Sequence, residues 1–332
     1  MDCYCLKDID TEKWNELVEK SQVASFFQTP SCYHFYQSLP FVEPFVYGVE
    51  HQGQLLAVAC GYIIADGGKL KQFFSRRAII PGGFLLADNC PTEAVTCLLN
   101  FTKNALKKKA IFVEVRNYDD YACFSSAIQA AGFEYQPHLN FHVDTTSLES
   151  SLQKLSSTKR RDVKVSIKEG AELSLLDNEA DLRAYYDLLR DLYKTKVKTP
   201  LFPYEFFQKL YQWPEGRIFV VKYQGRVLGG SVCVELPNRV LYEWFVCGLD
   251  RTIKNVYPST LATWGAIEYA STHEITRFDM MGAGKPNDGY GVREFKAKFG
   301  GTLVEHGRFC YVANPMLFFI GRLAVKLLKH LK

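Results

Sequence analysis

The sequence has no run of about 20 consecutive apolar residues, the length that a membrane-spanning helix requires. Residues 1–8 also lack the basic start and the apolar stretch of a secretion signal. We therefore expect a cytoplasmic protein whose ten cysteines are thiols. Cys3 and Cys5 are the only closely spaced cysteines, and the sequence does not contain the two C-x-x-C pairs of a typical zinc site. We therefore predict no metal site.

Charge of one sign is scarce as well. The 40 lysines and arginines nearly balance the 36 aspartates and glutamates, and the net charge of +4 is too small to indicate a polyanionic partner by itself. A content of 47% hydrophobic and 23% charged residues is typical of a globular protein. At 332 residues, the length favours two domains.

The two halves of the chain share a pattern. Residues 46–57 and 218–229 each consist of an apolar run, a Gln-Gly pair and a second apolar run, as a β-hairpin requires. The two Gln-Gly pairs lie 172 residues apart, at 52 and 224. A second echo, from Gly132 into one strand and from Gly301 into another, has a shift of 169 residues. Two echoes in the same order indicate a tandem duplication.

Each half reads as helix, hairpin, further strands, helix, strand, helix and a last strand. Helices are expected at 12–20 and 182–194, and the later strands at 111–115 and 277–280. We therefore predict an α/β (α+β) protein of two similar domains, each a mixed central sheet flanked by helices. The polar stretch 144–150 is the expected junction, with a helix starting at Ser147. The predicted domains are 1–146 and 147–314, followed by a C-terminal amphipathic helix at 315–332.

The most informative segment runs from residue 278 to 301. A strand ends at Asp279, and a loop containing Gly282 and Gly284 leads to a short helix with Arg293 and Lys296. Glycines let backbone N–H groups approach a ligand, and two cations three residues apart share one helix face. That pair could hold a phosphate or stabilise an oxyanion. The alternative is a plain glycine turn before a solvated basic helix.

The strand FDMMGAG (278–284) followed by YGVREFKAKFGG (290–301) resembles the signature of the FemABX family of peptidoglycan-bridge aminoacyltransferases. Two further segments, 76–84 and 157–166, resemble a segment of that family's first domain and the basic helix that opens its second. The resemblance implies two tandem GNAT-type acyltransferase domains, with the active site in the second.

The resemblance assigns a role to Lys296, which corresponds to the lysine of the family's Phe-Lys block. It would bind the acceptor's phosphate or stabilise the developing oxyanion, with Phe295 packed beneath it, and Tyr290 belongs to the same stretch. A family acidic residue proposed as a base does not carry over, because Arg116 stands at that position with Glu114 two residues earlier.

Other residues are candidates from their own setting. Glu243, beside Trp244 on a strand, would have a raised pKa if buried and could take a proton from an ammonium, or it could point to solvent. Asp279 could be a base or cap the glycine loop. Lys198 could receive a phosphorylated acceptor, or be solvated. Arg160, in the basic cluster that also includes Lys159, could contact tRNA, or belong to a solvated helix face.

The donor side departs from a typical acetyltransferase. The loop at 251–259 lacks the glycines that cradle the pyrophosphate of acyl-CoA and contains Pro258. The missing glycines disfavour acyl-CoA as the donor. The resemblance to the FemABX family implies aminoacyl-tRNA instead, with acyl-CoA as the alternative and no other cofactor.

The last segment begins with Asn314-Pro315, a good helix start. Arg322, Lys326 and Lys329 form a cationic stripe on an otherwise apolar helix, which suits the surface of an anionic membrane. The alternative is a helix docked on the protein's own core.

Together these features predict a FemABX-type acyltransferase or aminoacyltransferase acting on an amine of a phosphate-bearing cell-envelope precursor, such as a peptidoglycan precursor, in the cytoplasm or at the inner face of the membrane. Two alternatives are an acyl-CoA-dependent N-acyltransferase on an amino sugar and a non-catalytic protein that binds an envelope precursor or a partner.

Overall fold

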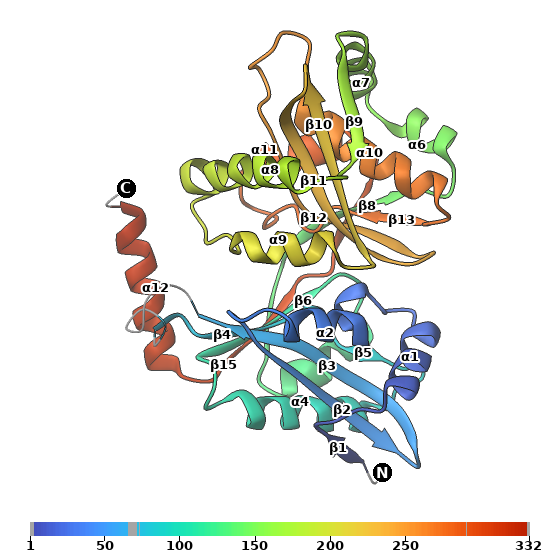
Figure 1. The fold of residues 1–332 in the computed structure, drawn as a ribbon. Helices are drawn as coiled ribbons and strands as arrows, with labels where there is room; N and C mark the ends of the chain where they lie inside the picture. The colour runs from blue at the N-terminus through green and yellow to red at the C-terminus, as the bar shows by residue number, and fades with distance from the viewer. Residues whose placement is uncertain (1–2, 66–71, 73, 290, 331–332) are drawn as a thin grey trace. The chain divides into compact units, whose positions relative to one another are not determined.

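A computed structural model of the protein describes residues 3–65, 72, 74–289 and 291–330. The chain forms two compact units (Figure 1). The first unit is made of Met1–Pro137 and His306–Lys332, and the second of His138–Glu305.

The first unit is a mixed sheet with helices on both faces. Its strands are β1 (Tyr4–Leu6), β2 (Glu43–His51), β3 (Gln54–Ile64), β4 (Arg77–Gly82), β5 (Leu85–Leu86), β6 (Phe112–Asn117), β7 (Glu134–Gln136) and β15 (Arg308–Val312). Its helices are α1 (Thr11–Lys20), α2 (Pro30–Gln37), α4 (Thr92–Leu106), α5 (Ser125–Ala130) and α12 (Pro315–His330), with short 3-10 turns η1 (Phe26–Gln28) and η2 (Ala122–Phe124).

The strand order in this sheet is β1-β2-β3-β4-β6-β15-β7, with β5 beside β3. Only the β4–β6 pair is parallel. Helix α4 covers one face, and α1 and α2 lie on the other (Figure 1). Alternate side chains of the strands are therefore buried against α4, where Val95, Leu98 and Leu99 complete the core.

The second unit repeats this plan. Its strands are β8 (Leu139–Asp144), β9 (Ala171–Leu175), β10 (Gly216–Tyr223), β11 (Arg226–Leu236), β12 (Val240–Gly248), β13 (Arg277–Asp279) and β14 (Thr302–Glu305). Its helices are α6 (Leu148–Lys154), α7 (Ser157–Lys168), α8 (Glu179–Leu192), the π-helix η3 (Tyr193–Val197), α9 (Tyr204–Tyr211), α10 (Pro258–Thr272) and α11 (Gly291–Ala297).

The strand order in the second sheet is β9-β10-β11-β12-β13-β8-β14, and only β12–β13 is parallel. Helix α10 packs on one face, while α8 and α9 pack on the other (Figure 1). The two sheets therefore have the same order and the same single parallel pair. This confirms the predicted fold class, two similar domains with mixed central sheets.

One strand of each sheet comes from the other half of the sequence pattern. The last strand of the first half, β8, lies between β13 and β14 of the second sheet, and the last strand of the second half, β15, lies between β6 and β7 of the first. The units consequently divide at 137/138 and 305/306 rather than at the predicted 146/147 and 314/315. The reason is that strand pairing, which is non-local, places β8 and β15.

The predicted hairpins are present in both units. Gln52 and Gly53 have φ values of 48° and 81°, and Gln224 and Gly225 have 50° and 74°. Two successive residues with positive φ are the mark of a type I′ turn, whose twist matches that of the strands it joins.

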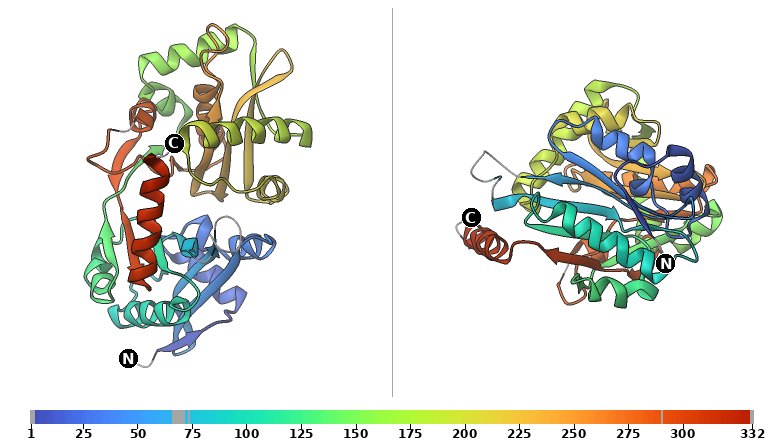
Figure 2. Two further views of the ribbon diagram at one scale, coloured as in Figure 1. Left: turned by 90° about the vertical axis from the view of Figure 1, so that its left-hand side faces the viewer. Right: turned by 90° about the horizontal axis from the view of Figure 1, so that it is seen from below.

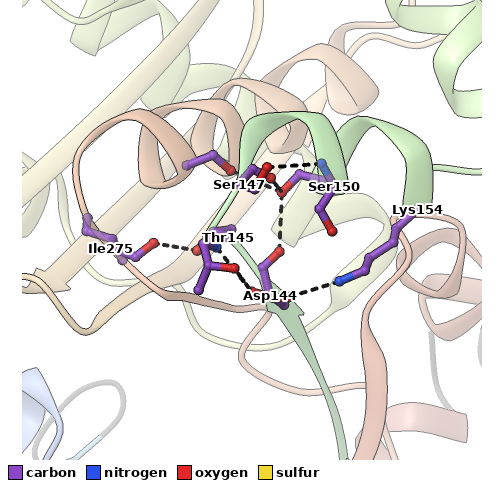
Figure 3. Close-up of polar contacts among 9 residues, drawn as sticks. Asp144, Thr145, Ser147, Ser150, Lys154 and Ile275 are labelled. Carbon is purple, nitrogen blue, oxygen red and sulfur yellow. Dashed lines mark hydrogen bonds and ion pairs between the residues drawn. The ribbon is translucent and has the colours of Figure 1, made fainter.

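The expected junction at 144–150 lies inside the second unit (Figure 3). Ser147 caps α6, as predicted. The hydroxyl of Thr145 donates to the carbonyl of Ile275 at 2.6 Å, and the Lys154 ammonium pairs with Asp144 at 2.9 Å. These contacts tie the segment to the sheet, so it is an ordered corner of the second unit.

The predicted helix at 315–332 is present as α12, which lies apart from α1, α2 and α4 (Figure 2). Asn314 caps it, because its side-chain oxygen accepts the N–H of Leu317 at 3.0 Å. The side chains of Lys326 and Lys329 lie outside the described residues.

Candidate active site

The candidate site lies where β12 and β13 diverge. The two strands pair only from Val240 to Tyr242, opposite Arg277–Asp279. The chain then follows β8 instead, since the N–H of Met280 donates to Phe141 at 3.1 Å. Beyond Asp279 the two strands no longer pair with each other. Backbone carbonyls that would bond across a continuing parallel pair therefore bond to other groups. At an open sheet, strand ends of this kind are where ligands bind.

Lys296 lies at this divergence. Helix α11 carries its side chain inward, where it is buried, and its ammonium donates to the carbonyls of Met280 and Gly282, the latter at 2.8 Å. An ammonium has three donors, so one N–H of Lys296 has no partner among the described residues. Burial lowers the pKa of Lys296, although the nearby carboxylates of Glu243 and Asp279 oppose the shift.

Glu243 is buried in the same region, on β12. Its Oε1 accepts hydrogen bonds from Thr263 at 2.8 Å and Ser231 at 3.1 Å, and its buried Oε2 has no hydrogen-bond partner among the described residues. Burial raises the pKa of Glu243, and the Lys296 charge and the two hydroxyls only partly offset this. Of the two alternatives for Glu243, the structure shows the inward one, with a raised pKa, and the buried Oε2 without a hydrogen-bond partner makes this carboxylate the candidate proton acceptor of the site.

Asp279 is buried at the end of β13, and each of its oxygens has a polar neighbour. Oδ1 accepts from Asn140 and from the N–H of Met281, both at 2.7 Å, and Oδ2 lies 3.1 Å from Nε2 of His142. Burial alone would raise the pKa of Asp279, but the bonds from His142, Asn140 and Met281 outweigh it, and the pKa is lowered. This environment favours the capping interpretation over a role as base.

The glycine loop has the backbone conformation that glycine favours. Gly282 and Gly284 have φ values of 112° and 78°, and a Cβ on Gly282 would lie 3.3 Å from the His138 ring. The N–H of Gly282 donates to Asn140 at 2.7 Å. The loop is thus fixed by the sheet beneath it, and it presents the Gly282 carbonyl to Lys296.

Arg293, predicted to bind a phosphate together with Lys296, contacts backbone carbonyls of the glycine loop. Its Nε donates to the carbonyl of Ala283 at 2.9 Å, and its two terminal nitrogens donate to the carbonyls of Lys285 and Pro286. The guanidinium clamps the glycine loop onto α11. The structure therefore gives no support to Arg293 as a partner of Lys296 in phosphate binding. Tyr290 lies outside the described residues.

Phe295 packs against Phe299, with ring centroids 5.1 Å apart. A second buried lysine, Lys159 on α7, holds its ammonium 4.1 Å from the centroid of Phe295 and donates to the Thr260 hydroxyl at 2.6 Å. Burial lowers the pKa of Lys159.

The sequence placed Lys159 in a basic cluster that could contact tRNA or be a solvated helix face, and neither alternative predicted this buried contact. The available signal was the helical spacing of the buried face of α7, where Lys159 lies in line with Asp162, Val163 and Ser166. Its neighbour Arg160 is exposed, which agrees with both alternatives for the basic cluster.

Trp244 lies at a β-bulge, where the register between β11 and β12 shifts. The shift places Trp244 and Phe245 on the α9 face, with Trp244 5.1 Å from Phe206 and Phe245 5.2 Å from Phe207. Trp244 is therefore part of an aromatic cluster on the face of the sheet opposite Glu243. Lys198 is exposed at the end of η3, and no described contact links it to Lys296.

The start of α10 has its own side-chain partners. The N–H of Ser259 donates to Asp250 at 3.1 Å, and the N–H of Tyr257 donates to the hydroxyl of Ser166 at 3.0 Å. A helix start of this kind would otherwise be an anion site. Here two of its donors are used within the protein.

Glu114 and Arg116, the departure noted on β6, form an ion pair in the first unit. Glu114 accepts from Arg116 at 2.5 Å and from Arg308 at 3.2 Å. Burial would raise the pKa of Glu114, but the two arginines outweigh it and lower the pKa to about 2. A carboxylate held so firmly in its ionised form is a poor proton acceptor at neutral pH.

Among the described residues, no group of three or more His, Cys, Asp or Glu side chains is placed to hold a metal ion. In the same part of the chain, no helix is long and apolar enough to cross a membrane.

Two mixed sheets of identical order, each with one parallel pair, define the protein as a tandem GNAT fold. Residues 154–296 match the family model described as an acetyltransferase (GNAT) domain, which confirms the predicted acyltransferase-type domain in the second unit. No curated protein matches the chain in sequence.

Three solved structures share the fold over nearly the whole chain. The crystal structure of FemX has a TM-score of 0.73 at 16% identity, with 96% of this chain and 99% of that chain covered. A tandem GNAT protein from the clavulanic acid biosynthesis pathway has a TM-score of 0.62 at 10% identity, covering 95% and 99%. L-PGS from Bacillus licheniformis has a TM-score of 0.58 at 13% identity, covering 98% and 99%. The predicted resemblance to the FemABX family is confirmed at the level of the fold.

Proposed function

We propose that the chain is a FemABX-type acyltransferase that moves an aminoacyl or acyl group onto an amine of a phosphate-bearing cell-envelope precursor, such as a peptidoglycan precursor. The observation that carries this proposal is the buried Glu243–Lys296 pair at the β12–β13 divergence. Burial raises the pKa of the Glu243 carboxyl and lowers the pKa of the Lys296 ammonium, and the charge of each opposes the shift of the other. The carboxylate would take a proton, and the lysine would give a hydrogen bond.

The reaction would be a direct attack of the acceptor amine on the donor ester. A C–N bond forms, the ester C–O bond breaks, and the amine's proton passes to Oε2 of Glu243 before it reaches the leaving oxygen. The remaining N–H of Lys296 would stabilise the oxyanion that develops on the carbonyl. Removal of one such donor from an enzyme typically costs about 10²- to 10³-fold in rate.

Aminoacyl-tRNA is our proposed donor. The start of α10 supports this, because its N–H groups at Tyr257 and Ser259 are engaged by Ser166 and Asp250. A phosphate-bearing acceptor agrees with the fold shared with FemX and with L-PGS. The action of the protein at the inner face of the membrane is part of the same proposal.

Acyl-CoA is the second candidate donor, favoured by the matched acetyltransferase domain and by the tandem GNAT neighbour. Calorimetry with charged tRNA and with acyl-CoA separates the two. Micromolar binding of acyl-CoA, without binding of charged tRNA, would replace the first candidate with an N-acyltransferase on an amino sugar. Binding of precursor without turnover of either donor would indicate a non-catalytic binding protein.

Lys296→Ala tests the site itself. We expect kcat to fall by about 10²-fold or more, measured as acyl transfer to the precursor in a single turnover. Lys298→Ala is the matched control, since Lys298 is exposed two residues further on and should keep the rate within about twofold. A folded Lys296→Ala protein with the wild-type rate would refute the role of this lysine.

A further inference from the structure

Among the described residues, helix α12 contacts the first unit through Phe318 and Gly321. Phe318 packs edge-on against Phe112 of β6, with ring centroids 5.2 Å apart. One turn along the same side, a Cβ on Gly321 would lie 3.2 Å from the carbonyl oxygen of Phe74, so the helix backbone approaches the unit closely there. The docked side of the helix is thus defined by Phe318 and Gly321.

The other side of α12 exposes large apolar side chains. Met316 and Phe319 are each 68% exposed, Ile320 is 42% exposed and Leu323 is 48% exposed. Their spacing of three, four and seven residues places them on one helix face. Four of the thirteen exposed large hydrophobic residues among those described lie on these two turns, which makes them a contiguous apolar surface. We call these four residues the apolar face of α12.

Positive charge accompanies this face. Arg322 is exposed between the apolar and docked sides, and its guanidinium lies 5.8 Å from the ring of Phe318. The sequence from 314 to 332 contains Arg322 and three lysines but no aspartate or glutamate. Cations next to an exposed apolar face are the pattern of helices that lie in the interface of an anionic bilayer.

We propose that the apolar face of α12 binds the surface of a membrane that contains anionic lipid. The helix would lie in the interface, with Phe319 and Leu323 among the acyl chains and Arg322 at the phosphates. A second copy of the chain fits less well, because a symmetric contact would bring the cations of two identical helices together. This inference deepens the proposed action at the inner face of the membrane, on which it rests, and its test does not use the transfer reaction.

The test is sedimentation of the full chain with vesicles. The protein should bind vesicles of phosphatidylcholine mixed with phosphatidylglycerol, and bind pure phosphatidylcholine more weakly. The double substitution Phe319→Glu with Leu323→Glu should weaken binding at least tenfold, since both side chains would enter the bilayer. Arg322→Gln should weaken binding about fivefold, in line with the usual contribution of one cation near an anionic surface.

Ile167→Glu is the matched control. Ile167 is 56% exposed on α7, another basic helix, so this variant replaces one exposed apolar side chain by an acid on a helix of the second unit. It should bind as the wild type does, and so should Lys296→Ala, which separates this test from that of the reaction. Equal binding by the Phe319/Leu323 double variant, or no binding to any vesicle, would overturn the inference. Dimerisation that the double variant abolishes, without vesicle binding, would assign the face to a second copy instead.

Discussion

Glu243 and Lys296 show how burial sets proton affinity in the second unit. Burial favours the uncharged form of each, so the pKa of the carboxyl rises while the pKa of the ammonium falls. Each charge opposes the shift of the other. The two groups therefore titrate closer together than in water, as a matched acid and base require.

This pairing predicts a bell-shaped pH profile of kcat. Glu243 must be ionised to accept a proton, so the rate should rise across its pKa, at a higher pH than the ordinary value of about 4.3. Lys296 must keep its proton, so the rate should fall across its lowered pKa. Glu243→Gln should remove the rising limb and reduce kcat by about 10²-fold or more.

Glu268→Gln is the control for this profile. The pKa of Glu268 is also raised by burial, but no described contact links it to Lys296. The profile should be unchanged in that variant. A rising limb that survives in Glu243→Gln would assign the base to another group.

At the scale of elements, the glycine loop depends on backbone conformation. Gly282, with its φ of 112°, supplies both the N–H that Asn140 accepts and the carbonyl that Lys296 binds. Gly282→Ala should reduce the free energy of unfolding by about 1–3 kcal/mol, because alanine is strained at this φ. It should also lower kcat, since Lys296 would lose its fixed position. Urea denaturation and single-turnover rates measure the two effects.

Gly289→Ala is the matched control in the same loop. Gly289 has a negative or extended φ, and nothing lies within 4 Å of an added Cβ. Stability and rate should stay close to those of the wild type. Equal effects from both substitutions would mean that the loop is sensitive to any substitution. That result would contradict a specific role for Gly282.

The sequence predicted elements whose signals are local. The Gln-Gly turns at 52 and 224, the cap at Ser147 and the helix start at Asn314 depend on residues within four positions of one another, and all were found. The inward position of Glu243 was predicted as one of two alternatives. The clamp of Arg293 and the burial of Lys159 were missed, because their partners come from other elements or from a loop with no regular period.

At the scale of the whole molecule, the two exchanged strands were beyond local reasoning. Pairing of β15 with β6 joins residues almost 200 positions apart, and no sequence period shows which sheet will take a strand. The repeat itself was visible, since each hairpin is followed by the same order of elements. Only the final strand of each half joins the sheet of the other half.

The exchange predicts which fragments fold. Residues 138–305 contain every strand of the second sheet, whereas 147–314 lack β8, the strand between β13 and β14. The first fragment should show a cooperative urea transition, because its core and its strand pairs are complete. The second should not, and neither should 1–146, which lacks β15. Cooperative unfolding of 147–314 at the same midpoint as 138–305 would contradict this.

The place of β15 also affects the order of events during translation. The first unit cannot close its sheet until residue 312 has left the ribosome, 175 positions after the rest of that unit ends at 137. At usual synthesis rates this is a delay of about 10 to 35 s, during which β6 and β7 lack the neighbour that separates them. The second unit can finish first, so we expect the first unit, which contains the amino-terminal part of the chain, to complete its sheet later.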